Sequence, residues 1–256
     1  MANENMHYLL GQGKIYTANL LPNGRPGSLR WMLDCSKCNA TFKFETVKLK
    51  ESFSGLRTTR KSIVVGREGS LEIVAREADP ANLALALSGV STSLDDGTVT
   101  GEAFCAEWVK DGRFALTYPA VSDVQVSDSA QVSVILPEER YTVDPDFGTI
   151  TLHGDLGALV LPLKASYKHE ALESTSMMSA IQKPIFIRYE GINLGNDGTP
   201  IVVEFYKVAF EPLKDLALIG DKEAEFSLSG DVLLDTSRPL STEMGQFGRF
   251  LRTRLA

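Results

Sequence analysis

Histidine and cysteine are scarce in this chain of 256 residues, which contains three of each. Cys35 and Cys38 form a lone C-x-x-C, and His7, His153 and His169 are widely separated. A structural zinc site needs four ligands, and a catalytic triad needs a histidine between a nucleophile and a carboxylate. We therefore interpret the cysteine pair as two reduced residues in a strand or turn, and we expect no metal or other cofactor.

Long hydrophobic runs and familiar catalytic motifs are also missing. No stretch approaches the roughly 18 apolar residues that cross a bilayer, and residues 1–7 lack the basic region and apolar run of a secretory signal. The sequence has no phosphate-binding GxxxxGK[ST], no GxGxxG that opens a helix, no HExxH and no GxSxG. These absences favour a non-enzymatic protein that is made in a cytoplasm and does not bind membranes.

The net charge of −7 is distributed unevenly along the chain. Residues 1–75 contain 11 Lys and Arg against 6 Asp and Glu, whereas residues 76–175 contain 6 against 16. This pattern argues against a protein that grips nucleic acid over its whole surface. It suits subunits that meet head to tail, basic surface against acidic surface, and it equally suits two solvated faces of opposite sign.

Short alternating segments separated by turn residues predict a mainly β fold with antiparallel sheets. The clearest segment is 41–50, where Phe42 and Phe44 alternate with Lys43 and Glu45, as in a half-buried strand. Further strands are expected at 62–65, 69–74, 114–119, 121–126, 131–136, 159–167, 183–190, 199–210 and 224–234.

One segment, residues 79–89, predicts a short helix. Asp79 is a favourable N-cap, Pro80 suits the first helical position, and Gly89 is a natural terminator. We expect this helix to flank a sheet. Its candidate packing residues are Pro80, Leu83, Ala84 and Leu87.

The predicted domain organisation is a β-sandwich core with an insertion. Residues 1–109 and 171–256 are expected to form the core, and 110–170 a small, acidic β-subdomain. Within it, residues 141–152 predict a hairpin whose turn is formed by Asp144-Pro145-Asp146 and Gly148.

Several phrases in the chain, taken in order, resemble bacteriophage tail tube proteins, also called major tail proteins. The most specific are Glu51-Ser52-Phe53-Ser54-Gly55, followed by Arg57, and Asn82-Leu83-Ala84-Leu85-Ala86-Leu87-Ser88-Gly89. The other segments that carry the resemblance are 13–16, 20–24, 31–33, 71–74, 141–144, 148–150 and 165–167.

The resemblance implies two packed antiparallel sheets with one flanking helix, in a subunit of which six copies form a ring. Sheets of neighbouring subunits would join into a barrel around a lumen, and the loop 49–62 would reach the adjacent ring. The candidate stacking residues are Glu51, Ser52, Phe53, Ser54, Gly55, Leu56, Arg57, Arg60 and Lys61. Of these, Glu51, Arg57, Arg60 and Lys61 are the candidates for ion pairs between rings.

A structural protein of the virion tail, assembled in the host cytoplasm, is the function that the resemblance implies. Its partners would be further copies of itself and other tail proteins: tape measure, tail terminator, baseplate or tip, and a sheath if the tail contracts. Genomic DNA would pass without specific binding, so we expect a net acidic lumen, with the insertion on the tube exterior.

Two alternatives remain from the sequence. The first is the tube of a related contractile injection or type VI secretion machine, which would have the same fold. The second is a β-sandwich binding or adhesion module, which would expose aromatic platforms. Trp31 and Trp108 lie in apolar contexts that predict core positions instead.

Overall fold

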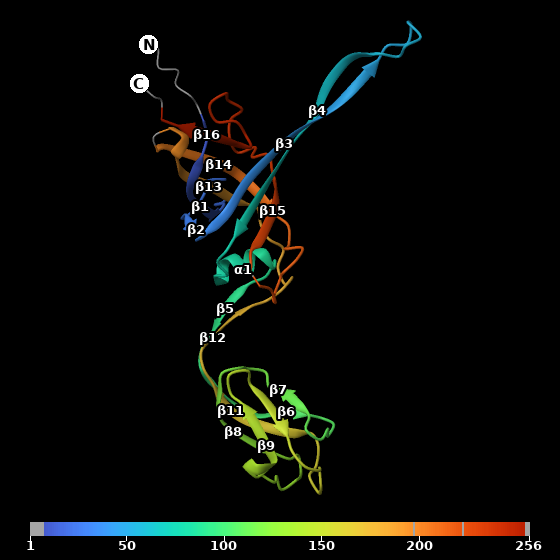
Figure 1. Cartoon of the computed structure of the whole chain (residues 1–256), viewed down its shortest axis with the longest axis vertical. Helices are drawn as coiled ribbons and strands as arrows, with labels where there is room; N and C mark the ends of the chain where they lie inside the picture. Colours follow the sequence, from blue (N-terminus) through green and yellow to red (C-terminus); the bar gives the residue numbers. More distant parts are fainter. Residues whose placement is uncertain (1–7, 197, 222, 254–256) are drawn as a thin grey trace. The chain divides into compact units, whose positions relative to one another are not determined.

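The computed structural model describes residues 8–196, 198–221 and 223–253, and it divides the chain into two compact units. Unit 1 comprises residues 1–91 and 175–256, and unit 2, the inserted unit, comprises Thr92–Ser174. The predicted mainly β class with one short helix is confirmed (Figure 1). Among the described residues, no helix has the length and apolar character needed to cross a membrane.

Unit 1 is built on one large antiparallel sheet with the order β2-β1-β13-β14-β15-β4-β3, and β16 also pairs with β14. Its strands are β1 (Gly11–Asn19), β2 (Arg30–Trp31), β3 (Cys35–Lys50), β4 (Thr59–Ala75), β13 (Ile185–Asn193), β14 (Thr199–Phe210), β15 (Phe226–Val232) and β16 (Gly248–Arg252). The strands predicted at 62–65 and 69–74 are one continuous strand, β4.

The strand β14 changes partners along its length, which turns the sheet into two layers. Its residues 201–205 pair with β16, and its residues 208–210 pair with β15. Side chains from β1 and β13 on one layer meet side chains from β4 and β15 on the other. The buried members of this core are Ile15, Met32, Leu71, Ile73, Leu85, Ala86, Ile187, Phe205, Val208, Phe210, Leu228 and Val232. Full burial of one such large aliphatic side chain contributes about 1.5–3 kcal/mol.

The helix α1 (Pro80–Ala86) begins as the sequence predicts. Pro80 occupies the first turn, and the Asp79 side chain accepts a hydrogen bond from the backbone amide of Asn82 at 3.1 Å. The helix ends with Ser88 at a positive φ of 48°, and the amide of Gly89 donates to the carbonyl of Ala84. The left-handed residue is therefore Ser88 rather than the predicted glycine.

The predicted packing face of α1 was wrong. Leu83, Ala84 and Leu87 are half-buried, whereas Leu85 and Ala86 are buried in the core. The reason is that this seven-residue helix has neighbours on more than one side. The segment that returns from the inserted unit also contacts it, with the Gln182 amide donating to the Ala84 carbonyl.

The inserted unit has its own core between two three-stranded sheets, β7-β10-β9 and β6-β11-β8. Its strands are β6 (Gly97–Cys105), β7 (Arg113–Ala115), β8 (Val121–Ser127), β9 (Tyr141–Asp144), β10 (Thr149–Leu152) and β11 (Leu163–His169). Where the chain enters and leaves the unit, β5 (Ser91–Leu94) pairs with β12 (Leu172–Thr175). Single turns of 3-10 helix lie at Glu138–Arg140 and, in unit 1, at Leu194–Asn196.

The unit begins at Thr92 rather than at the predicted 110, because β6 lies before 110 and pairs with β11. The predicted hairpin at 141–152 is confirmed as β9 and β10. Gly148 has a φ of +58°, and a Cβ atom there would lie 2.1 Å from the Tyr118 carbonyl oxygen. Only glycine fits this turn position, because its φ is positive and because the carbonyl of Tyr118 leaves no space for a Cβ atom.

Candidate assembly surfaces

The most exposed feature of unit 1 is the outer part of the β3–β4 hairpin. The strands pair from Cys35 opposite Ala75 to Lys50 opposite Thr59, whereas β15 covers β4 only over residues 70–75. Residues 41–50 and 59–69 therefore form a two-stranded hairpin arm, about 30 Å long at 3.4 Å per residue, with no strand on either edge among the described residues (Figure 1). An isolated two-stranded ribbon is marginally stable in water, and among the described residues no third strand supports this part of the hairpin.

The arm continues the apolar face of the core beyond the core itself. Phe42 pairs with Gly69, and directly paired residues point to the same side of a sheet. Leu71 and Ile73 lie two and four residues from Gly69 along β4, so they share this face with Phe42 and Phe44. Leu71 and Ile73 are buried, but Phe42 and Phe44 are 69% and 63% exposed. The sequence correctly separates this aromatic face from Lys43, but the predicted half-buried strand was wrong for a single copy, because the described residues of unit 1 leave Phe42 and Phe44 mostly exposed.

The tip loop, residues 51–58, is organised around one carboxylate. Glu51 accepts hydrogen bonds from the backbone amides of Phe53 at 2.9 Å, Ser54 at 2.8 Å and Thr58 at 3.3 Å, and from the Ser54 hydroxyl. The Ser54 hydroxyl and the three amides lower the pKa of Glu51 from 4.5 to about 2. Glu51 is buried, so its charge shapes the loop from within. Its predicted role in an ion pair between rings does not fit this geometry, since its oxygens already have partners.

The other predicted stacking residues are all exposed, and they combine apolar and basic character. Phe53 and Leu56 are 79% and 78% exposed, and the Arg60 guanidinium lies 5.9 Å from the centre of the Phe53 ring. Arg57, Arg60 and Lys61 form no ion pair with another described residue. The remaining exposed members are Ser52, Ser54 and Gly55. The tip loop thus presents two unpacked apolar side chains beside basic groups.

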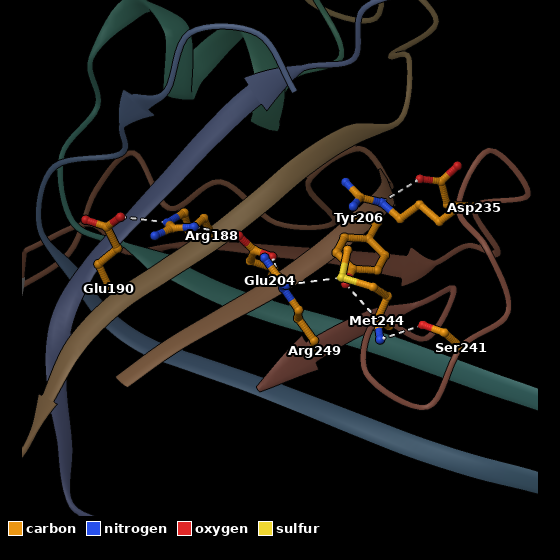
Figure 2. A network of polar contacts seen from close by, with 9 residues as sticks. Arg188, Glu190, Glu204, Tyr206, Asp235, Ser241, Met244 and Arg249 are labelled. Carbon is orange, nitrogen blue, oxygen red and sulfur yellow. Dashed lines mark hydrogen bonds and ion pairs between the residues drawn. The ribbon is translucent and has the colours of Figure 1, made fainter. Parts of the chain in front are cut away.

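The outer face of the β1–β13–β14 layer carries a different kind of feature, a row of charged side chains. Arg188 and Arg249 both bind Glu204, with Nη1–Oε1 and Nε–Oε2 distances of 2.5 and 2.6 Å, and Arg188 Nε also contacts Glu190 at 2.6 Å (Figure 2). The Glu204 side chain is 8% exposed. The cross-strand register places Arg188, Glu204 and Arg249 side by side on β13, β14 and β16. Glu204 therefore ties three neighbouring strands together.

A second cluster fixes the loop between β15 and β16 against the same face. The Arg238 guanidinium lies 3.6 Å from the centre of the Tyr206 ring, and its Nε contacts Asp235 at 3.1 Å (Figure 2). The Tyr206 hydroxyl donates to the backbone carbonyl of Met244 at 2.8 Å. Sequence reasoning missed both clusters, because their members are distributed over the 62 residues from Arg188 to Arg249 and no local spacing brings them together.

The two tryptophans differ in exposure. Trp31 is 40% exposed on this outer face, where the Lys14 amine lies 4.5 Å from the centre of its ring, so its predicted core position was wrong. Trp108 packs against the core of the inserted unit, as predicted.

The two cysteines of the C-x-x-C pair lie in partly buried surroundings. Cys35 and Cys38 are free, both lie on β3 against the core, and burial raises the pKa of each thiol to about 11. The thiols therefore remain protonated and unreactive near neutral pH. Among the described residues, no group of three or more His, Cys, Asp or Glu side chains is placed to hold a metal ion.

The chain is mainly β, and its outermost hairpin exposes apolar and basic side chains. The chain belongs to a family described as "Protein of unknown function UCP028589", whose family model matches residues 8–251. No curated protein matches the chain.

Proposed function

We propose that this protein is a structural subunit that assembles with copies of itself into stacked rings, as the tube of a bacteriophage tail. The observation that carries the proposal is the hairpin arm. It extends the core face with exposed phenylalanines, and among the described residues both of its edges are unpaired, so strands of a second copy could pair with it.

Self-assembly is favoured over binding to an unrelated partner by the open sheet of unit 1. Its last strands, β3 and β2, lie at the two ends of the strand order, and each has one unpaired edge among the described residues. Strand pairing between neighbouring copies would satisfy these edges and would close a barrel that one copy leaves open. Contacts of this kind that close by rotation give rings, and those that do not close give a tube.

Negative-stain electron microscopy of the purified chain over a concentration series tests the proposal. We expect rings, or hollow tubes with a lumen of at least about 20 Å, wide enough for a DNA duplex with its phosphates. A chain that stays monomeric at every concentration would contradict it.

The cargo of such a tube is tested separately by the charge of its lumen. The predicted net acidic lumen repels the phosphates of DNA and lets the duplex slide. A map of the assembled tube whose channel is lined mainly by lysine and arginine would contradict DNA passage, while leaving the tube assembly itself standing.

A further inference from the structure

Charges of opposite sign are concentrated in two separate parts of the chain. Residues 41–69, the hairpin arm with its tip loop, contain seven Lys and Arg against three Asp and Glu, a balance of +4. The inserted unit, residues 92–174, contains five against fourteen, a balance of −9. These parts belong to different compact units, so two copies of the chain offer each other complementary surfaces.

The inserted unit also presents an exposed apolar surface, the valine patch, formed by Val132, Val134 and Val160, which are exposed by 83%, 50% and 47%. The buried Asp128 holds it in shape. Its two carboxylate oxygens accept the amide of Val134 at 2.7 Å and the amide of Val160 at 3.2 Å, so the two segments lie next to each other. Like the tip loop, the valine patch is an apolar surface arranged around an internal carboxylate.

The course of the chain in unit 1 makes a contact between copies geometrically reasonable. From the tip loop, β4 runs from Thr59 to Ala75, and α1 and Ser91 follow, where the chain leaves for the inserted unit. The tip loop and this exit thus lie at opposite ends of unit 1 (Figure 1). Two copies of unit 1 can align head to tail. The tip loop of the first copy then approaches the end of the second copy where Ser91 leads into the second copy's inserted unit.

We propose that the tip loop of one copy docks on the inserted unit of a second copy. Phe53 and Leu56 pack against the valine patch, and the basic residues beside them, Arg57, Arg60 and Lys61, face the acidic surface of the unit. The contact is heterologous, so each copy uses its arm and its inserted unit once, and the contact propagates along an axis. The inference rests on the proposed function, because a repeated contact of this kind is useful to a chain that assembles.

Photo-crosslinking in the full-length chain tests the docking. p-Benzoylphenylalanine replaces Phe53 in one variant and, as a control of similar exposure in the same unit, Leu240 in another; Leu240 is 82% exposed. After irradiation, we expect covalent dimers from position 53 whose crosslinked peptides, identified by mass spectrometry, lie within residues 92–174. Adding Val132→Ser, at a site too exposed to affect folding, should lower the dimer yield about tenfold.

The charge contribution has its own test in the same assay. The triple substitution Arg57→Glu, Arg60→Glu and Lys61→Glu should abolish the crosslink at low salt, and 1 M NaCl should weaken the crosslink of the unaltered loop, because the Debye length then falls to about 3 Å. A dimer yield from position 53 no higher than from position 240, crosslinked peptides only from unit 1, or crosslinks only within one chain would each overturn the proposal.

Electron microscopy of the same samples separates this inference from the proposed function. Tubes without a crosslink into residues 92–174 would refute the docking site and leave the tube proposal standing. Conversely, the expected crosslink in samples that contain no rings or tubes would support the docking and contradict the tube.

Discussion

The carboxylate of Glu51 accepts the backbone amide of Ser54 at 2.8 Å, across the tip of the longest hairpin in the described chain. The same carboxylate accepts the amide of Phe53. A residue that the sequence suggests as an external ion-pair partner is therefore the internal anion of the tip loop. Its effect on any partner is indirect, through the position it gives to Phe53 and Leu56.

Glu51 should titrate well below an ordinary glutamate. Its folded pKa of about 2 lies below the ordinary value of 4.5, so its stabilising effect on the tip loop is complete above pH 4.5 and is lost as the pH falls through 2. Carbon-13 NMR of the labelled glutamate carboxyls should therefore show one resonance, absent in Glu51→Gln, with a midpoint below pH 3. A Glu51 midpoint near 4.5 would contradict the arrangement of amides around it.

The exposed phenylalanines of the hairpin arm should matter for assembly and not for the stability of a single copy. Replacing both Phe42 and Phe44 by serine removes side chains that one copy does not bury, so we expect the free energy of unfolding to change by no more than about 0.5 kcal/mol each. Leu71→Ala, on the same face but buried, should cost about 2–5 kcal/mol.

Denaturant unfolding measures both effects at a concentration where the chain is monomeric, and electron microscopy at high concentration then scores assembly. We expect the double serine variant to assemble less than the parent chain. Equal assembly would show that this face of the arm stays in solvent in the assembled state.

Glu204 should be the most sensitive charged residue in unit 1. Substitution by alanine leaves Arg188 and Arg249 side by side without their shared carboxylate. We expect the free energy of unfolding to fall by about 2 kcal/mol, which lies between the values for exposed and fully buried ion pairs. The matched control is Glu72→Ala, which breaks the exposed pair with Lys37 and should cost less than about 1 kcal/mol. Equal losses in the two variants would show that solvent screens the Glu204 cluster.

The sequence predicts much of the local structure of this protein, but it predicts the exposure of side chains poorly. The strand predicted at 131–136 was also wrong, because only Ile135 of that segment forms an isolated bridge, with Ser127. Alternation places the strand 199–210 with the bounds of β14, and Asp79 with Pro80 places the start of α1, because strand pleating and helix capping are local. The burial of Phe42 depends on whether another layer covers the strand. That is a tertiary property, and alternation alone cannot report it.

In the candidate site, too, the sequence predicts local features and misses those that depend on tertiary structure. A charged, glycine-containing loop at 51–61 is visible in the sequence, and the structure places it at an exposed tip. The inward turn of the Glu51 carboxylate could not be predicted, because it depends on the backbone angles of the loop, with Gly55 at a φ of +81° and Arg57 at +49°. Likewise, the Glu204 cluster requires the register between three strands that are distant in sequence.

The end of α1 offers a paired test of the backbone geometry that joins the two units. A Cβ atom on Gly89 would lie 1.6 Å from the carbonyl oxygen of Ser176, so Gly89→Ala must push apart the two chain segments and should cost about 1–3 kcal/mol. The neighbouring Ser88→Gly removes the strain of a left-handed serine and should be neutral or stabilising by up to about 1 kcal/mol. Thermal unfolding of both variants measures the difference. A destabilised Ser88→Gly together with a neutral Gly89→Ala would contradict both the left-handed conformation of Ser88 and the close approach of Gly89 to Ser176.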